Sequence, residues 1–300
     1  DSDEIKKIHN NIADNIKEGE ARKIYAANRT LALLKVIFNF AIDNGSEIEN
    51  PCIKVKPFKE KSRDRFLQPE ELAEFFKSLE QELNQTAKDY IYLSLLSGAR
   101  RSNVLSMKWQ DLNLDRGEWR IPETKNGETQ ILPLVQSAVE ILKERKKAND
   151  KADKYSEYVF PSDSKSGHYA DPKRAWKRIL QRATIELWKK DKRINQLIKQ
   201  VQEKLKDKQV YNKFNEIKKE AEKQDISLPI GITDLRLHDL RRTLGSFQAS
   251  LGANSFIIGK SLGHKSQSAT AIYSRLNLDP VRASMEAATN EIMRYREGNK

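Results

Sequence analysis

The chain has 300 residues, with 55 Lys or Arg against 43 Asp or Glu, which gives a formal net charge of +12. Its apolar runs are far shorter than the roughly 20 residues that a membrane-spanning helix needs, and we expect no secretory signal, because no basic segment is followed by an apolar run near residue 1. The single cysteine, Cys52, excludes an internal disulfide framework. We therefore expect a cytoplasmic protein of about two domains, and a chain that begins with Asp1 is expected to be part of a longer protein.

The first strong helical pattern runs from Glu20 to Ile42, and Asn44-Gly45 supplies a C-terminal stop. Its polar face carries side chains that can hydrogen-bond phosphates or bases, although a solvated face explains the pattern equally well. These residues are Arg22, Lys23, Asn28, Arg29 and Lys35. Two prolines and many charges over residues 50–65 predict extended chain. We predict a partial helical domain over 1–56, a linker over 57–66 and a larger domain over 67–300.

The larger domain is predicted to be mainly helical with a small antiparallel sheet. The strand-like runs Glu118–Ile121 and Thr129–Leu134 are joined through an Asn-Gly pair that favours a tight hairpin turn, so Lys125 lies beside the hairpin tip. Helical spacing and start signals predict helices from residue 69, over 87–96, around 104–109, and over 137–147, 172–188, 238–251, 255–261, 268–273 and 280–295.

Residues 189–225 form an unusual segment with eleven Lys, one Arg and seven acidic residues around a thin apolar stripe. This pattern predicts one or two projecting amphipathic helices. A solvated insertion with a narrow buried seam is the favoured interpretation, while a DNA clamp or a protein contact is the alternative.

Several short motifs together provide the positive charge, the proton donors and the nucleophile that are suited to a phosphodiester. Each motif alone is a weak signal. Arg100 follows a glycine-marked turn, and by itself it is more typical of a structural ion pair. His238 and Arg241 lie on one face of a helix and can hold one phosphate; a helix N-terminus with a buried histidine explains them equally well. Further on, His264 directly follows Gly263, and Tyr273 comes nine residues later.

Taken together, these motifs resemble the tyrosine recombinases, the integrases of phages and genomic islands. The strings that carry the resemblance, in family order, are SGARRS, TKNGETQILPL, HDLRRT, LGHKS and TAIYSRL, together with KSRDRFLQPEEL and VFPSDSKSGHYADPKRAWKRI. The likeness covers about residues 20–188 and 230–290 and leaves the charged insertion unmatched. One departure is Asn103, because many members have an acidic residue there.

The resemblance implies a helical core-binding domain, a tyrosine-recombinase catalytic domain and six catalytic residues: Arg100, Lys125, His238, Arg241, His264 and Tyr273. Tyr273 would attack phosphorus and leave a 3′-phosphotyrosyl bond and a free 5′-hydroxyl. The two arginines would bind the non-bridging oxygens, with a further hydrogen bond from His264. Lys125 would protonate the departing oxygen. The proton of Tyr273 would go to His238 or to the phosphate, and neither metal nor another cofactor is expected.

The resemblance also implies partners. We expect binding to double-stranded attachment sites through Asn28, Arg29, Lys173, Arg174 and Lys177. A homotetramer on two duplexes is expected, with the apolar stripe of the C-terminal helix packing on a neighbour or in cis. Accessory DNA-bending proteins are possible partners. The alternatives are a type IB topoisomerase and a non-catalytic DNA-binding regulator on the same scaffold. The sequence identifies neither the target site nor the direction of recombination.

Overall fold

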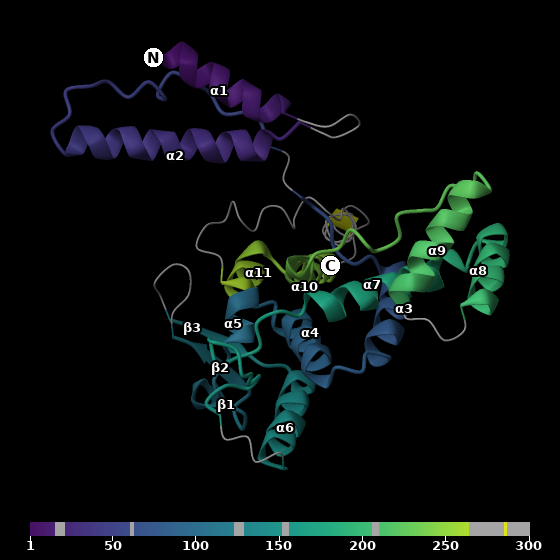
Figure 1. Cartoon of the computed structure of the whole chain (residues 1–300). Coiled ribbons are helices and arrows are strands. Elements are labelled where there is room, and N and C mark those ends of the chain that lie inside the picture. The colour runs from purple at the N-terminus through teal and green to yellow at the C-terminus, as the bar shows by residue number, and fades with distance from the viewer. Residues whose placement is uncertain are drawn as a thin grey trace, which may run out of the picture. The chain divides into compact units, whose positions relative to one another are not determined.

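The computed structural model describes residues 1–15, 22–60, 63–122, 129–151, 156–205, 210–263 and 285–286. The chain divides into two compact units, Asp1–Arg63 and Asp64–Lys300, and the boundary falls within the predicted linker. The described residues are mostly helical with one small antiparallel sheet (Figure 1), which confirms the predicted fold class. None of the described helices is long and apolar enough to cross a membrane.

The smaller unit is built on two packed helices, α1 (Ser2–Asp14) and α2 (Ile24–Asp43). Asp1 caps α1, because its carboxylate accepts from the backbone N–H groups of Asp3 and Glu4, both at 2.8 Å. Ile5, Leu31 and the thiol of Cys52 form the small core between the helices. The sequence pattern predicted α2, whereas α1 was missed.

The larger unit holds the remaining elements. They are α3 (Pro69–Glu80), α4 (Gln85–Ser97), α5 (Arg101–Leu105), a 3₁₀ turn (Trp109–Asp111), β1 (Leu112–Asn113), β2 (Glu118–Ile121), β3 (Gln130–Pro133), α6 (Gln136–Lys151), α7 (Lys173–Trp188), α8 (Lys192–Lys204), α9 (Val210–Lys223), α10 (Leu237–Ser250) and α11 (Ser255–Leu262). The sheet has the order β1-β2-β3, with Trp119 opposite Leu112 on one side and Leu132 on the other.

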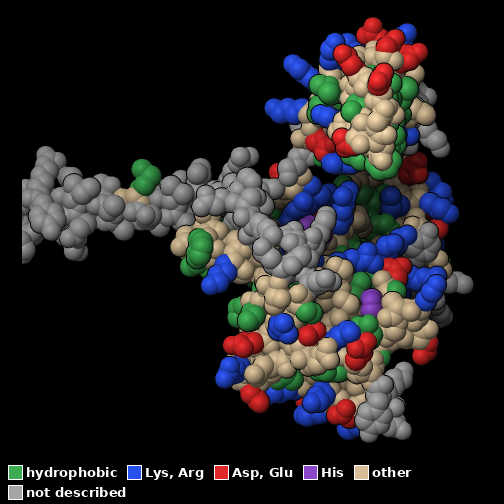
Figure 2. All heavy atoms as spheres, turned by 90° about the vertical axis from the view of Figure 1, so that its left-hand side faces the viewer, with side chains coloured by type: hydrophobic (Ala, Val, Ile, Leu, Met, Phe, Trp, Pro, Cys, Tyr) green, Lys and Arg blue, Asp and Glu red, His purple; other side chains and the backbone are tan. Residues whose placement is uncertain are grey.

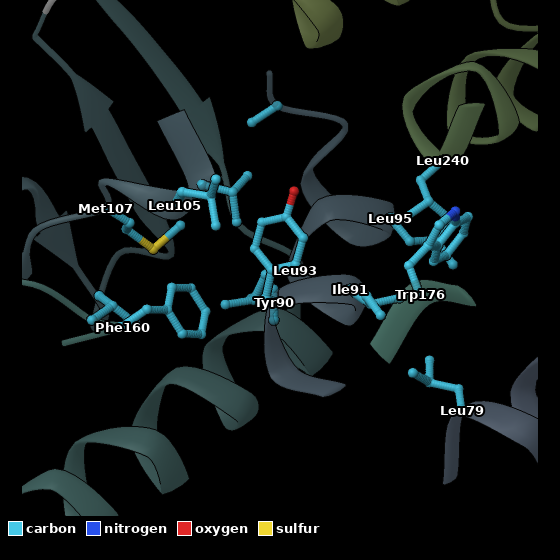
Figure 3. Packing of buried hydrophobic residues seen from close by; sticks show 14 of the residues in the cluster. Leu79, Tyr90, Ile91, Leu93, Leu95, Leu105, Met107, Phe160, Trp176 and Leu240 are labelled. Carbon is cyan, nitrogen blue, oxygen red and sulfur yellow. The ribbon is translucent and has the colours of Figure 1, made fainter. Parts of the chain in front are cut away.

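Helix α4 runs through the main core of the larger unit. Its residues Tyr90, Ile91 and Leu93 are fully buried, and α4 packs against both α6 and α10. Figure 3 shows Tyr90 surrounded by apolar side chains from several elements; its ring meets the edge of Phe160 at a centroid distance of 6.2 Å. Because α4 is held on several sides, the turn at its C-terminal end has a fixed position against α10.

The charged insertion contains two amphipathic helices, α8 and α9, as its periodicity predicted. They share an apolar cluster separate from the main core, in which Trp188 at the end of α7 stacks on Phe214 at 5.2 Å. The helix expected around 104–109 is instead α5 followed by a 3₁₀ turn. The helices expected over 268–273 and 280–295 lie outside the described residues, apart from residues 285–286 in helical conformation.

Candidate active site

The turn after α4 places Arg100 and depends on a glycine. Gly98 ends α4 in the left-handed conformation with φ of +59°, and a Cβ there would lie 2.7 Å from Cδ2 of Leu262 and 2.9 Å from Cδ2 of Leu244. Another residue would be strained at this φ and would have to displace the side chains of Leu244 and Leu262, so glycine suits the close approach of this turn to α10 and α11. Two residues later, Arg100 precedes α5 in extended conformation, with its side chain half-buried.

Arg241 joins three segments that lie far apart in the sequence. It is 5% exposed, and its Nη1 donates to the carbonyl oxygen of Gly98 at 2.6 Å while its Nη2 donates to the carbonyl oxygen of Leu262. Gly98 belongs to the motif of Arg100, and Leu262 belongs to the motif of His264. The guanidinium thus fixes the relative positions of the two arginine motifs and of the chain that leads to His264.

The start of α10 presents His238 beside Arg241. Asp239, which is fully buried, accepts from the backbone N–H of Arg236 at 2.8 Å and from Nη1 of Arg242 at 2.7 Å. The bond to Arg236 satisfies the backbone N–H of the residue that caps α10. His238, in the first turn of the helix, is exposed. The alternative of a helix start with a buried histidine is therefore wrong in its second part. Asp239 is a site residue to which the sequence pattern assigns no role.

Arg100 lies close enough to affect the pKa of His238, although the two residues are far apart in the sequence. Although His238 is partly exposed to solvent, the protein atoms around its imidazole desolvate the ring and lower its pKa below the ordinary value. The positive charges of Arg241, Arg242 and Arg100 lower this pKa further, against an opposing effect of Asp239. The imidazole is therefore kept neutral, in a form that can accept a proton.

We expect the imidazole of His238 to titrate below the usual histidine pKa of about 6.5 in an NMR titration. Because the unfolded chain then binds this proton more readily than the folded chain, the contribution of His238 to the free energy of unfolding decreases as pH falls through that range. The Arg100→Gln variant should raise the His238 pKa, and His238→Gln identifies the resonance. A pKa that does not respond to Arg100→Gln would show that the two groups are not neighbours.

The remaining predicted catalytic residues, Lys125, His264 and Tyr273, lie outside the described residues. Two described residues that lie near Lys125 and His264 in the sequence, Gln130 and Gly263, are close to each other in space. A Cβ at Gly263, whose φ is +64°, would lie 2.2 Å from Oε1 of Gln130. Gln130 begins β3 after the predicted hairpin tip, and Gly263 precedes His264. The structure therefore brings together Arg100, His238 and Arg241, and it places the chain ends that flank the Lys125 hairpin and His264 beside each other.

Three of the expected DNA contacts lie on one exposed helix start. Lys173, Arg174 and Lys177 occupy the first turns of α7, and each of these residues is exposed. In Figure 2, Lys and Arg side chains gather on one face of the larger unit. Such a surface is suited to the phosphates of a nucleic acid. These three DNA contacts remain predictions.

The expected polar face of α2 needs a correction at Asn28. This residue is 8% exposed, and its carboxamide oxygen accepts from Nε2 of His9 at 3.0 Å and from the backbone N–H of Phe58 at 2.9 Å. Its amide nitrogen donates to the Phe58 carbonyl oxygen at 2.9 Å and to Glu60 at 2.8 Å. These bonds occupy the side chain within the smaller unit, so Asn28 is better explained as a structural residue. The side chain of Arg29 is 75% exposed and bonds to Glu60.

A model of the phage integrase family matches residues 65–279, which include Arg100, His238 and Arg241. The chain belongs to this family. Over 132 residues, 44% of this chain, it is 31% identical to the prophage integrase IntF of Escherichia coli strain K12. Over 91 residues, 29% of the chain, it is 29% identical to the tyrosine recombinase XerC of Staphylococcus aureus. The chain matches 28% of the length of the first relative and 30% of the second.

Solved structures share the fold of this member of the phage integrase family. One is the Tn1549 transposon integrase in complex with transposon right end DNA, with a TM-score of 0.57 and 17% identity, covering 95% of this chain and 84% of that one. Another is a lambda integrase dimer bound to a core site, with a TM-score of 0.57 and 18% identity, covering 91% and 78%. Among the described residues, no three His, Cys, Asp or Glu side chains are grouped to hold a metal ion.

Proposed function

We propose that this chain is the catalytic part of a site-specific DNA recombinase, acting in the integration or excision of a mobile element. The observation that carries the proposal is Arg241, whose guanidinium donates to Gly98 and Leu262 and so assembles three motifs around one position. Family membership supports the same conclusion. The substrate would be double-stranded DNA, in line with the DNA complexes of the two structural relatives.

The proposed reaction replaces one phosphodiester bond with another. The phenolic oxygen of Tyr273 attacks phosphorus, the bond from phosphorus to the 5′ oxygen breaks, and Lys125 gives that oxygen a proton. His238 accepts the phenolic proton, which its lowered pKa supports because the ring is neutral near pH 7. The phosphotyrosyl bond conserves the energy of the broken phosphodiester bond. A 5′-hydroxyl from another strand can therefore reverse the step without the consumption of a nucleotide.

Arg100 and Arg241 would stabilise the charge that develops on the non-bridging oxygens, with His264 adding a hydrogen bond. Stabilisation of this kind is strongest when the donors are already in place before the reaction. Three observations support this part of the proposal: the burial of Arg241, its bonds to two backbone carbonyls and the nearby charge of Arg100.

The proposal is tested with a nicked DNA duplex that loses a short strand on cleavage. The duplex contains a site that is first selected from random DNA by its binding to the protein. The wild-type chain should form a denaturation-resistant adduct on the 3′ side of the break and release a 5′-hydroxyl. A second duplex with a free 5′-hydroxyl separates the alternatives: a recombinase joins the cleaved strand to it, whereas a topoisomerase-like enzyme relaxes supercoils without exchange. Binding without any adduct would indicate the non-catalytic regulator and overturn the proposal.

Replacing Arg241 with lysine should slow single-turnover cleavage about a hundredfold, the scale on which removal of one preorganised donor acts. A lysine has no planar fork, so it cannot hold Gly98 and Leu262 together while it also faces a phosphate. Arg193→Lys, on the exposed surface of α8, is a matched control that should cleave at the wild-type rate. If Arg241→Lys cleaves as fast as the wild type, Arg241 does not stabilise the transition state.

A homotetramer on two duplexes is part of the proposal. The chain carries an apolar stripe of Val281, Met285 and Ile292 near its C-terminus, and Met285 is 64% exposed. Packing of this stripe on a neighbouring copy would link the protomers. The lambda integrase structure is described as a dimer at its core site, which supports assembly on DNA.

A further inference from the structure

The residues that open the larger unit are tied to the helix that carries His238 and Arg241. The backbone N–H of Leu67, a fully buried residue, donates to Oγ1 of Thr243 at 3.0 Å. Thr243 is 3% exposed, lies in α10 two positions after Arg241, and donates through the same hydroxyl to the carbonyl oxygen of Asp239 at 2.9 Å. One hydroxyl therefore connects the incoming chain to the first turns of α10.

A second set of contacts holds the same stretch of chain. Arg65 donates through Nη1 and Nη2 to the carboxylate of Glu71 at 2.8 and 2.7 Å, and through Nε to Asp234 at 3.2 Å. Glu71 lies in the first turn of α3, and Asp234 lies three residues before α10. The chain thus enters the larger unit fixed both to α3 and to the segment that leads into α10.

We propose that Thr243 and Arg65 are positioning residues for the cleavage reaction, because together they fix α10 and hence the orientation of His238 and Arg241. The proposal rests on the proposed function. Neither side chain belongs to the catalytic set, and the role follows from the bonds of Thr243 to Leu67 and Asp239 and of Arg65 to Glu71 and Asp234. A small rotation of α10 would displace both catalytic side chains at once, since they share one helix face.

The test compares two buried threonines that make the same kind of bond. Thr184 in α7 is fully buried, and its Oγ1 accepts from the backbone N–H of Ile232 at 3.1 Å. Thr184→Val and Thr243→Val each remove one hydroxyl and leave one buried backbone donor unpaired, while the side-chain shape is kept. The two variants should therefore lose similar amounts of thermal stability. Of the two threonines, only Thr243 bonds to α10, so only Thr243→Val should disturb the helix that carries His238 and Arg241.

In full-length protein, Thr243→Val should slow single-turnover adduct formation about tenfold, the scale of a lost bond to a buried donor, with the dissociation constant for the DNA site unchanged. Thr243→Ser should restore the rate, and Thr184→Val should cleave like the wild type. Arg65→Gln should slow cleavage in the same way, and this variant decides the question if Thr243→Val does not fold.

The proposal is overturned if folded Thr243→Val cleaves at the wild-type rate, if Thr243→Ser is as slow as Thr243→Val, or if Thr184→Val is slowed equally. If Thr243→Val does not fold, a wild-type rate for Arg65→Gln overturns it. Failure of the proposed function has a different signature, since the wild-type protein itself would then bind DNA and form no adduct.

Discussion

The Tyr273→Phe variant is expected to form no covalent adduct with a nicked DNA substrate that traps the wild-type chain. Phenylalanine keeps the aromatic ring and removes the single oxygen that would attack phosphorus, so no other part of the proposed reaction changes. A phenol has a pKa of about 10 and attacks poorly without help, and in the proposed reaction the neutral imidazole of His238 accepts its proton. Loss of the oxygen should reduce adduct formation to background.

The control for this variant is Tyr92→Phe. Tyr92 lies in α4 of the same unit, and its hydroxyl bonds to Glu80. Removing that hydroxyl should leave adduct formation intact. Tyr273→Phe should still bind the DNA site, which a gel-shift titration measures. An adduct of equal yield from Tyr273→Phe would show that another residue is the nucleophile.

The Lys125→Ala variant is expected to cleave ordinary DNA about 10² to 10⁴ times more slowly, the range over which general acids act. The departing 5′ oxygen would leave as an alkoxide if nothing protonated it. A substrate with sulfur in place of that bridging oxygen removes the need, because a thiol has a pKa of about 8.5 and leaves readily as the thiolate. Lys125→Ala should therefore cleave the sulfur-containing substrate nearly as fast as the wild type.

Recovery of the cleavage rate on the sulfur-containing substrate distinguishes a lysine that acts as general acid from one that only binds the DNA backbone. Lys143→Ala, on α6, is the matched control and should cleave both substrates normally. A Lys125→Ala variant that is equally slow on the oxygen and sulfur substrates would show that Lys125 does not protonate the leaving group. In that case a described residue such as His238 would have to be tested for the role.

Local patterns predicted most of the larger unit because each element carries its own signal. Pro69 and two following acidic residues mark the start of α3, and the alternating run Glu118–Ile121 is β2 at the expected boundaries. By contrast, β1 has only two residues and α1 combines a strong cap with few apolar positions. Such short or weakly apolar elements depend on their packing partners, which a single sequence does not reveal.

The sequence predicts the candidate site as residue types in a fixed order but not its geometry, and the roles of these residues stay predictions. The separation of Arg100 from Arg241 gives no indication that Arg241 would bond to the turn before Arg100. Asn28 shows the reverse case, because it lies among cations on a helix and still faces inward to bind Phe58. Which polar side chain turns inward is decided by backbone groups from other segments that need partners.

The most direct test of the account is the identity of the residue that carries DNA in the trapped adduct. After digestion of the protein and the DNA, mass spectrometry of the remaining nucleotide-modified peptide locates the covalent bond. We predict a 3′-phosphate ester on the phenolic oxygen of Tyr273. A bond to any other side chain, or attachment through a 5′ phosphate, would contradict the proposed reaction.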